Sequence, residues 1–339
     1  MNVFKLRSAV WEITLACCFS CKYCGSAGGK ARAGELTTEE CLDVVHQLSE
    51  LGCRRVSLIG GEVFMRKDWK TIVKELTAYG IRTAVITNGF LFNDNVLEDI
   101  KDANVESVAV SLDSVEPVHD KYRQGGSYER AMQAIDKLSD AGITVTVIST
   151  LNSESVGHLK DFYEILCTKP IAAWQLQACS PMGNAAKSGI DYRFDFNEVI
   201  SFVKENMDEA PFCMGIADNI GYYTESEGTL RGNSDSFFKG CKAGLSSIGI
   251  DSVGNVRGCE SMYDEAFIEG NVRERSLRDI WDDPRAFSYN RSFALSKLTG
   301  ACGKCEYGKY CAGGCRSYNF FVHGKIYESP ACARVFNKE

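Results

Sequence analysis

Short apolar runs alternate with amphipathic stretches along the first half of the chain. The runs are rich in β-branched residues, and the segments after them carry apolar residues at helical spacing. The strands we expect are 10–15, 56–59, 83–87, 107–112, 144–150 and 173–178. The helices we expect are 37–51, 69–79, 95–102, 127–141 and 156–167, the first opened by a capping box of Thr37 and Glu40. One strand–helix unit per roughly 25 to 35 residues favours right-handed crossovers around a parallel sheet.

Polar or glycine residues stand at the carboxyl ends of these strands. The clearest groups are Gly60-Gly61-Glu62, Thr87-Asn88-Gly89 and Ser111-Leu112-Asp113. Because the carboxyl ends of parallel strands meet at one edge, where barrels and open sheets bind ligands, these groups predict one shared site.

The strand–helix rhythm stops near Cys179, and the rest of the chain has a different character. One more helix is expected over 195–208, and the Gly-, Ser- and Tyr-rich segment 216–239 is interpreted as a linker or substrate-facing loop. The tail from Gly240 is too poor in apolar residues to hold a core unaided, so metal would supply its folding free energy. The expected organisation is therefore an α/β domain over 1–215, the linker over 216–239 and a metal-binding tail over 240–339.

Charge and cysteine content narrow the class of protein. The net charge of −7 argues against a nucleic-acid partner, and no apolar run is long enough to span a membrane. No signal peptide is recognisable, so a cytoplasmic location is expected. Sixteen cysteines do not suit a disulfide scaffold there, because the cytosol keeps thiols reduced. Four of them fall in 17–24 and seven in 241–332, and such clustering indicates metal.

Cys17, Cys21 and Cys24 form a three-cysteine motif just after the first expected strand. Three thiolates can hold a 4Fe–4S cube and leave one iron open to chelate the amino and carboxylate groups of S-adenosylmethionine (SAM). One electron then yields a 5′-deoxyadenosyl radical, which is cofactor chemistry that the protein positions and shields. A zinc site is the alternative, but structural zinc takes four ligands and no histidine lies nearby. Cys18 is interpreted as a packing or supporting residue.

This motif and the strand-end groups resemble the radical SAM superfamily, in which a CxxxCxxC loop follows the first strand of a partial (β/α)6 barrel. The resemblance implies an α/β, TIM-like partial barrel and a SAM site. It places Gly60, Gly61 and Glu62 at the SAM amino group, although Val63 stands where proline commonly follows. It also implies cofactor-binding positions at Asn88, Ser111, Asp113 and Arg123, the last toward the SAM carboxylate. A surface charge is the alternative for Arg123.

The tail resembles the SPASM domain of the same superfamily. The order of its cysteines matches that domain at seven positions, which are Cys241, Cys259, Cys302, Cys305, Cys311, Cys315 and Cys332. A zinc ribbon fits these spacings poorly. The resemblance implies two auxiliary 4Fe–4S clusters, and thus three in all. Cys241, Cys259 and Cys315 would bind the first, and Cys302, Cys305, Cys311 and Cys332 the second. The fourth ligand of the first auxiliary cluster would be Asp235 or Cys213, or that iron would stay open and touch the substrate.

Glu260 follows Cys259 directly, and by analogy with sulfatase-maturing relatives it is a candidate base on the substrate. An exposed glutamate without a catalytic role is the alternative.

The resemblance implies oxidative modification of a ribosomally made peptide, by cross-linking or by rearranging a side chain or the backbone. Sixteen residues before Cys17 leave no room for a leader-binding domain, so we expect a separate recognition protein or docking on the barrel. A flavodoxin or ferredoxin would donate electrons. Alternatives are formylglycine formation in a sulfatase, epimerisation with Cys179 or Cys213 as hydrogen donor, and a non-catalytic metal scaffold. The strand-end motifs argue against the scaffold, which has no use for a SAM pocket.

Overall fold

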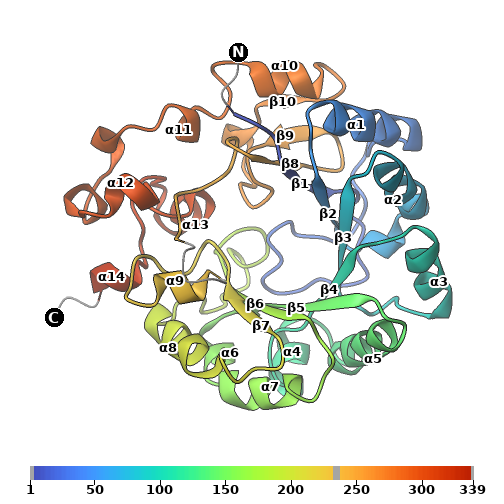
Figure 1. The fold of residues 1–339 in the computed structure, drawn as a ribbon, viewed down its shortest axis with the longest axis horizontal. Coiled ribbons are helices and arrows are strands. Elements are labelled where there is room, and N and C mark those ends of the chain that lie inside the picture. Colours follow the sequence, from blue (N-terminus) through green and yellow to red (C-terminus); the bar gives the residue numbers. More distant parts are fainter. Residues whose placement is uncertain (1–3, 232–236, 337–339) are drawn as a thin grey trace.

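The computed structural model describes residues 4–231 and 237–336. Its strands form one ten-stranded sheet in the order β10-β9-β8-β1-β2-β3-β4-β5-β6-β7. Neighbouring strands from β8 through β1 to β7 are parallel. Figure 1 shows the sheet curving around a central space, with the helices on its outer side. This is the α/β partial barrel that the sequence predicts.

The six predicted strands are present, with ends that differ by a few residues. They are β1 (Ser8–Glu12), β2 (Arg55–Ile59), β3 (Arg82–Thr87), β4 (Ser107–Ser111), β5 (Thr144–Leu151) and β6 (Ala173–Ala178). Two further strands, β7 (Cys213–Ile216) and β8 (Ser247–Ile250), were not predicted, because runs of four residues carry little periodicity. The tail adds β9 (Asn255–Arg257) and β10 (Gly270–Asn271), each paired antiparallel with its neighbour.

The outer helices of the barrel follow the predicted pattern closely. They are α1 (Thr38–Glu50), α2 (Trp69–Ala78), α3 (Asp94–Asp102), α5 (Ser127–Asp140) and α8 (Phe196–Asn206). The capping box at Thr37 and Glu40 is confirmed. The predicted helix over 156–167 is instead two short helices, α6 (Ser153–Val156) and α7 (Leu159–Leu166), and α4 (Glu116–Tyr122) was not predicted. No described helix has both the length and the apolar character needed to cross a membrane.

The tail is attached to the barrel through the sheet itself. Strand β8 pairs in parallel with β1, from Ser8 opposite Ser247 to Trp11 opposite Ile250. The segment expected as a linker contains α9 (Glu227–Leu230), and the tail continues through α10 (Leu277–Asp282), α11 (Ser288–Arg291), α12 (Gly308–Cys311), α13 (Arg316–His323) and α14 (Ala333–Phe336). The apolar core therefore runs from the barrel into the tail, where it includes Ile248, Ile250 and Trp281.

Candidate active site

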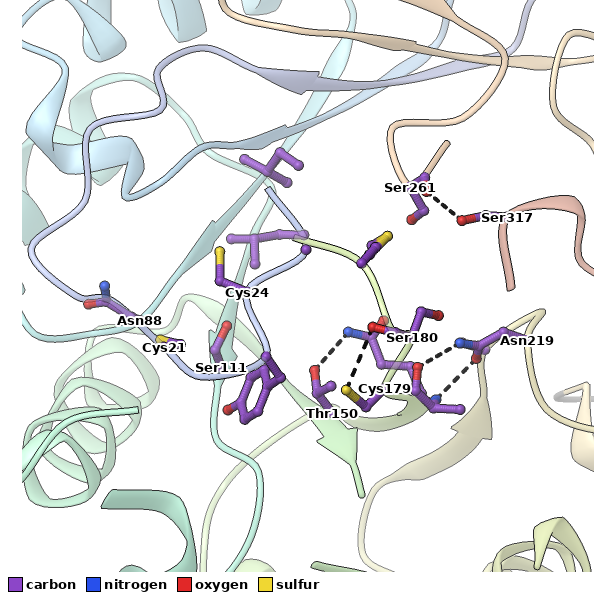
Figure 2. A pocket seen from close by; sticks show the side chains of 18 of the residues that line it. Cys21, Cys24, Asn88, Ser111, Thr150, Cys179, Ser180, Asn219, Ser261 and Ser317 are labelled. Atoms are coloured by element: carbon purple, nitrogen blue, oxygen red, sulfur yellow. Dashed lines mark hydrogen bonds between the residues drawn. The ribbon is translucent and has the colours of Figure 1, made fainter. Parts of the chain in front are cut away.

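A cavity of about 370 Å³, the central cavity, opens at the carboxyl ends of the parallel strands. It brings together the three N-terminal cysteines and two cysteines of the tail, Cys259 and Cys315. The predicted cofactor-binding residues that line it are Gly60, Gly61, Asn88, Ser111 and Arg123. Figure 2 shows side chains from the cluster loop, the strand ends and the tail facing this space. The shared site expected from the strand ends is therefore one space that also reaches the tail.

The cluster loop, residues 16–29, carries Cys17, Cys21 and Cys24, and all three line the central cavity. Main-chain N–H groups point at two of the sulfurs, from Phe19 to Cys17 Sγ at 3.4 Å and from Gly28 to Cys24 Sγ at 3.3 Å. Within the described residues, no three His, Cys, Asp or Glu side chains are grouped so as to hold a single metal ion. A 4Fe–4S cube takes one thiolate per iron, so three cysteines that line one cavity are enough to hold a cube with one iron left open.

The end of β2 lies directly under the cluster loop. Gly61 N–H donates to Thr14 O at 2.8 Å and Glu62 N–H to Ala16 O at 2.7 Å. A Cβ atom on Gly61 would stand 2.3 Å from the carbonyl oxygens of both Leu15 and Ala16. Glycine is therefore required here for the close approach of two backbones.

The carboxylate of Glu62 is turned away from the cavity, contrary to its expected contact with the SAM amino group. It is 1% exposed and accepts hydrogen bonds from Thr87 Oγ1 and Asn88 N, each at 2.8 Å. Both oxygens are thus occupied by the end of β3, and the Gly60-Gly61 main chain is what faces the cavity. These two bonds tie the end of β2 to the end of β3, next to Asn88.

Asp113 and Arg123 form a buried ion pair at the cavity wall. Arg123 Nη2 donates to Asp113 Oδ1 at 3.0 Å, Thr150 N donates to the same oxygen at 2.9 Å, and Tyr23 donates its hydroxyl hydrogen to Asp113 Oδ2. Burial alone would raise the pKa of Asp113, but the Arg123 charge holds it below its usual range. The alternative reading of Arg123 as a surface charge is wrong, because its side chain is only 10% exposed.

Replacing Arg123 with glutamine should destabilise the fold by about 3–5 kcal/mol, because it leaves the buried Asp113 carboxylate without its counter-charge. Urea unfolding of the folded protein measures the loss. An Arg123→Gln/Asp113→Asn double variant should recover part of it, and the exposed Arg130→Gln on α5 should be near neutral. Equal losses in the single and double variants would contradict the pairing.

His119 is a buried neutral base behind this ion pair. Its Nδ1 accepts from Asp113 N–H at 3.2 Å, and burial lowers the pKa of His119 to about 4. The unfolded chain binds this proton below a pKa near 6.5, while the folded protein stays unprotonated until about pH 4. The free energy of unfolding should therefore fall as pH drops through this window, by about 2 kcal/mol at pH 5. Urea titrations at pH 7 and pH 5 should show that the free energy of unfolding falls less in His119→Asn than in the parent protein. An equal fall in both would refute the prediction.

Several tail cysteines lie in electrostatic reach of one another: Cys241 acts on Cys259 and Cys315, and Cys302, Cys305 and Cys332 act on Cys311. Burial raises the pKa of Cys259 to about 12 and also raises that of Cys315, and the nearby Cys241 thiol raises both further. Burial likewise raises the pKa of Cys311 to about 11, with Cys302, Cys332 and Cys305 as its thiol neighbours. Thiols this reluctant to ionise need a cation beside them to become ligands.

Tyr222 lies near two of the tail cysteines. Its hydroxyl oxygen accepts from Cys315 N–H at 2.9 Å, and its carbonyl oxygen is 3.9 Å from Cys332 Sγ. Tyr222 was not singled out in the sequence, because one tyrosine in a Gly- and Tyr-rich segment gives no local signal.

The candidates for a fourth ligand and for a hydrogen donor are placed differently. Cys213 is exposed on β7 and does not line the central cavity, and Asp235 lies outside the described residues. Cys179 is 1% exposed and does line the cavity. Asp218, which the sequence did not suggest, also lines the cavity and lies in electrostatic reach of Cys315.

Glu260 is neither exposed nor in the cavity. Its neighbours in sequence, Cys259 and Ser261, face the cavity, whereas Glu260 is 5% exposed and buried toward Glu12. Burial raises its pKa well above the usual range, and neither carboxylate oxygen has a hydrogen-bond partner among the described residues. The geometry therefore does not support Glu260 as a base on a substrate in the cavity.

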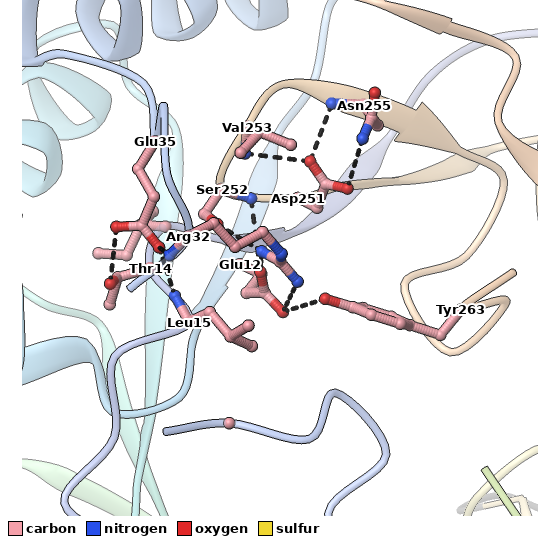
Figure 3. Close-up of polar contacts among 12 residues, drawn as sticks. Glu12, Thr14, Leu15, Arg32, Glu35, Asp251, Ser252, Val253, Asn255 and Tyr263 are labelled. Carbon is pink, nitrogen blue, oxygen red and sulfur yellow. Dashed lines mark hydrogen bonds and ion pairs between the residues drawn. The ribbon is translucent and has the colours of Figure 1, made fainter. Parts of the chain in front are cut away.

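Charged residues at the junction of barrel and tail surround this region. Glu12, at the end of β1, pairs with Arg32 from the segment after the cluster loop and accepts from the Tyr263 hydroxyl at 2.9 Å. Asp251 pairs with Arg257 at 2.9 Å. Figure 3 shows Glu12 of β1 and Arg32 of the segment after the cluster loop beside Ser252 of the β8–β9 turn, and both bond to Ser252. The junction thus holds the cluster-bearing segment against the tail.

Comparisons with known proteins agree with this architecture. The family model of the radical SAM superfamily matches residues 11–166, and the model of the SPASM iron–sulfur cluster-binding domain matches residues 241–306. An AdoMet-dependent heme synthase of Oleidesulfovibrio alaskensis is 28% identical, with 96% of this chain and 87% of the relative covered. The mycofactocin maturase MftC of Mycobacterium ulcerans is 29% identical, with 92% and 83% covered.

A solved structure shares the fold at lower identity. Streptococcus suis SuiB bound to S-adenosylmethionine superposes with a TM-score of 0.77 and 18% identity, covering 97% of this chain and 77% of that one. The same protein with the precursor peptide SuiA gives a TM-score of 0.78. With the two matched domains and the cavity that joins their cysteines, the chain is an enzyme of the radical SAM superfamily with a C-terminal SPASM domain.

Proposed function

We propose that this enzyme oxidatively modifies a ribosomally made peptide with SAM and three 4Fe–4S clusters, one that binds SAM and two auxiliary. The observation that carries the proposal is the central cavity, which Cys17, Cys21 and Cys24 line together with Cys259 and Cys315. A substrate held between the two sets of cysteines would lie beside both a radical source and an electron acceptor. The maturase MftC and the peptide-bound SuiB structure support a peptide substrate.

The cluster and SAM, when bound, supply a 5′-deoxyadenosyl radical that abstracts a hydrogen atom. The chain's own residues would bind, orient and shield. Cys17, Cys21 and Cys24 would hold the cluster, the Gly60-Gly61 main chain would accept from the SAM amino group, and Arg123 would stand near its carboxylate. Asn88 and Ser111 complete the lining on this side.

The loop after β6 covers the cluster loop and would exclude water. Asn184 donates its main-chain N–H to Cys24 O and its side-chain amide to Cys21 O, each at 2.9 Å. Met182 packs so closely on Gly25 that a Cβ there would stand 2.3 Å from its Cε. Excluding water protects a reactive intermediate from side reactions.

A tetrapyrrole substrate is the second candidate, because several relatives are heme synthases. The cavity lining disfavours it. Arg123 is the sole basic side chain among the described lining residues, and Asp113 already neutralises it. A porphyrin with several carboxylates would bring charges that this cavity does not pair. A neutral peptide segment fits the Thr, Gln, Ser and Asn side chains that line the rest.

Anaerobic reconstitution tests the cofactor part of this proposal. Three clusters require about twelve irons per chain, one cluster about four, and a zinc ribbon none. Reductant should release 5′-deoxyadenosine from SAM, and failure to do so would refute the radical chemistry. An electron donor of the flavodoxin or ferredoxin type should replace the chemical reductant.

Mass spectrometry of a co-expressed peptide, encoded by a short reading frame beside the gene, tests the substrate part. A loss of two hydrogens supports cross-linking, and excision of a fragment supports backbone cleavage. Deuterium uptake from solvent without other mass change would instead support epimerisation, for which the candidate hydrogen donor Cys179 lines the cavity. Conversion of a sulfatase cysteine to formylglycine would support the sulfatase-maturing alternative.

A further inference from the structure

A second cavity, also of about 370 Å³, lies beside the central cavity, where the segment before α8 faces α13 and residues 330–333. We call it the side groove. Its lining is largely apolar and includes Tyr192, Phe194, Phe196, Tyr318, Val322 and Ala331. The ring centroids of Phe194 and Phe196 are 5.2 Å apart, and those of Phe196 and Tyr318 are 5.8 Å apart. Aromatic side chains in such contact form a continuous surface for another apolar group.

The side groove adjoins the central cavity at Tyr318, which lines both cavities. Cys315 and Ser317, which precede it at the start of α13, line the central cavity alone. The first turn of α13 therefore separates the two spaces, with the Tyr318 ring at their junction. A chain lying in the side groove would therefore have Tyr318 between it and the reaction site.

One wall of the side groove offers unpaired main-chain groups. Residues 189–195 run without a turn, a bend or a sheet partner. Asp191 O accepts from Ser153 N–H at 3.1 Å, and Arg193 N–H is used by the Asp191 carboxylate at 3.2 Å. In contrast, the N–H and C=O groups of Tyr192 and Phe194 bond to no described residue. Free donors and acceptors on alternate residues are what an added strand pairs with.

The described rim of the side groove carries one basic side chain, Arg193, and two acidic ones, Asp191 and Asp195. Arg193 is 82% exposed and lies 3.5 Å from the Asp191 carboxylate. A rim of this kind offers no excess of positive charge for a phosphate or a membrane headgroup. Recognition would therefore rest on apolar contact and main-chain hydrogen bonds.

We propose that the substrate peptide docks in the side groove as an extended strand. It pairs with the main chain of Tyr192 and Phe194, places one large aliphatic or aromatic side chain against Phe194 and Val322, and passes Tyr318 into the central cavity. The side groove thus selects peptides with an apolar residue at a fixed distance from the modified one. This proposal rests on the peptide substrate of the proposed function.

The test uses the cluster-loaded enzyme with SAM and a displayed library of random twelve-residue peptides. Enriched peptides should share one large apolar position, and their binding is then measured by fluorescence anisotropy. Phe194→Ser should weaken binding by about tenfold or more, the effect of losing one buried apolar side chain. The matched control is Tyr79→Ser, which removes a partly exposed aromatic ring at the end of α2, far from both cavities. Its binding should equal that of the parent enzyme.

Hydrogen exchange provides a second readout that does not depend on a variant's folding. Exchange of the Tyr192 and Phe194 amides should slow when an enriched peptide binds to the parent enzyme, while the Tyr79 region stays unchanged. Iron content and peptide-independent release of 5′-deoxyadenosine should be the same in Phe194→Ser and parent.

Several results would overturn the side-groove proposal. These are no enrichment of any peptide, equal binding to Phe194→Ser and parent, or unchanged exchange at Tyr192 and Phe194. A peptide-independent dimer that Phe194→Ser dissociates would assign the side groove to a second copy of the chain instead. If peptides bound equally to Phe194→Ser and parent and the bound peptide still lost hydrogen, the proposed function would stand. Only docking in the side groove would then be refuted.

Discussion

Replacing Cys17 with alanine is expected to abolish reductive cleavage of SAM. The cluster loop offers three sulfurs to one cube, and with two the cube loses a covalent anchor next to its open iron. Release of 5′-deoxyadenosine, measured by chromatography, should fall by at least about 10³-fold, equivalent to about 4 kcal/mol in the barrier. Iron content should fall by about four per chain and no further, because the tail cysteines, which act on one another, would hold the two auxiliary clusters.

Cys18 provides the matched control for this prediction. It adjoins Cys17 in sequence, and Asn88 Nδ2 lies near both sulfurs, 3.5 Å from Cys18 Sγ and 3.9 Å from Cys17 Sγ, but Cys18 does not line the central cavity. Cys18→Ala should therefore keep its full iron content and most of its cleavage activity. The reverse pattern, with iron lost from Cys18→Ala and kept in Cys17→Ala, would show that the ligands are assigned wrongly.

Replacing Gly61 with alanine is expected to have the next largest effect. The new Cβ would stand 2.3 Å from two carbonyl oxygens of the segment that leads into Cys17, and neither backbone has room to yield. The strand end and the cluster loop must then separate, which displaces the SAM site relative to the cluster. A displacement of about 1 Å can cost about 10²-fold in rate. Single-turnover release of 5′-deoxyadenosine and SAM binding by calorimetry should both decline.

Gly29 is the matched control for Gly61. It lies at the other end of the same loop, bridged to Ala16, and a Cβ there would meet nothing within 4 Å. Gly29→Ala should therefore keep the parent activity. If Gly61→Ala and Gly29→Ala behaved alike, the close approach of β2 to the cluster loop would not matter for the reaction.

The local sequence carried most of the information about the fold. The capping box at Thr37 and the six long strands depend on residues within a few positions of one another, so their patterns are readable without tertiary contacts. Strand β7 was missed for the opposite reason. It has four residues and pairs along one edge only, so it exists because β6 lies beside it.

The direction of side chains at the site was less predictable. The sequence left two interpretations of Arg123, a surface charge and a cofactor contact. The structure places it against Asp113, ten residues away in sequence. Glu62 has the expected position but turns its carboxylate to the end of β3. A residue at the end of a strand can face either the cavity or the next strand. Which of the two it faces depends on partners in the next strand–helix unit, as Thr87 and Asn88 are for Glu62.

The sequence by itself determined the parallel α/β barrel, the three cysteines of the cluster loop and the seven of the tail, because spacing and periodicity are local properties. Tertiary structure alone decided that β8 joins β1, that Cys259 and Cys315 share a cavity with the cluster loop, and that Glu260 is buried toward Glu12. These contacts join residues more than two hundred positions apart. Their free energy comes from burial and pairing in the folded state, and no local pattern records it.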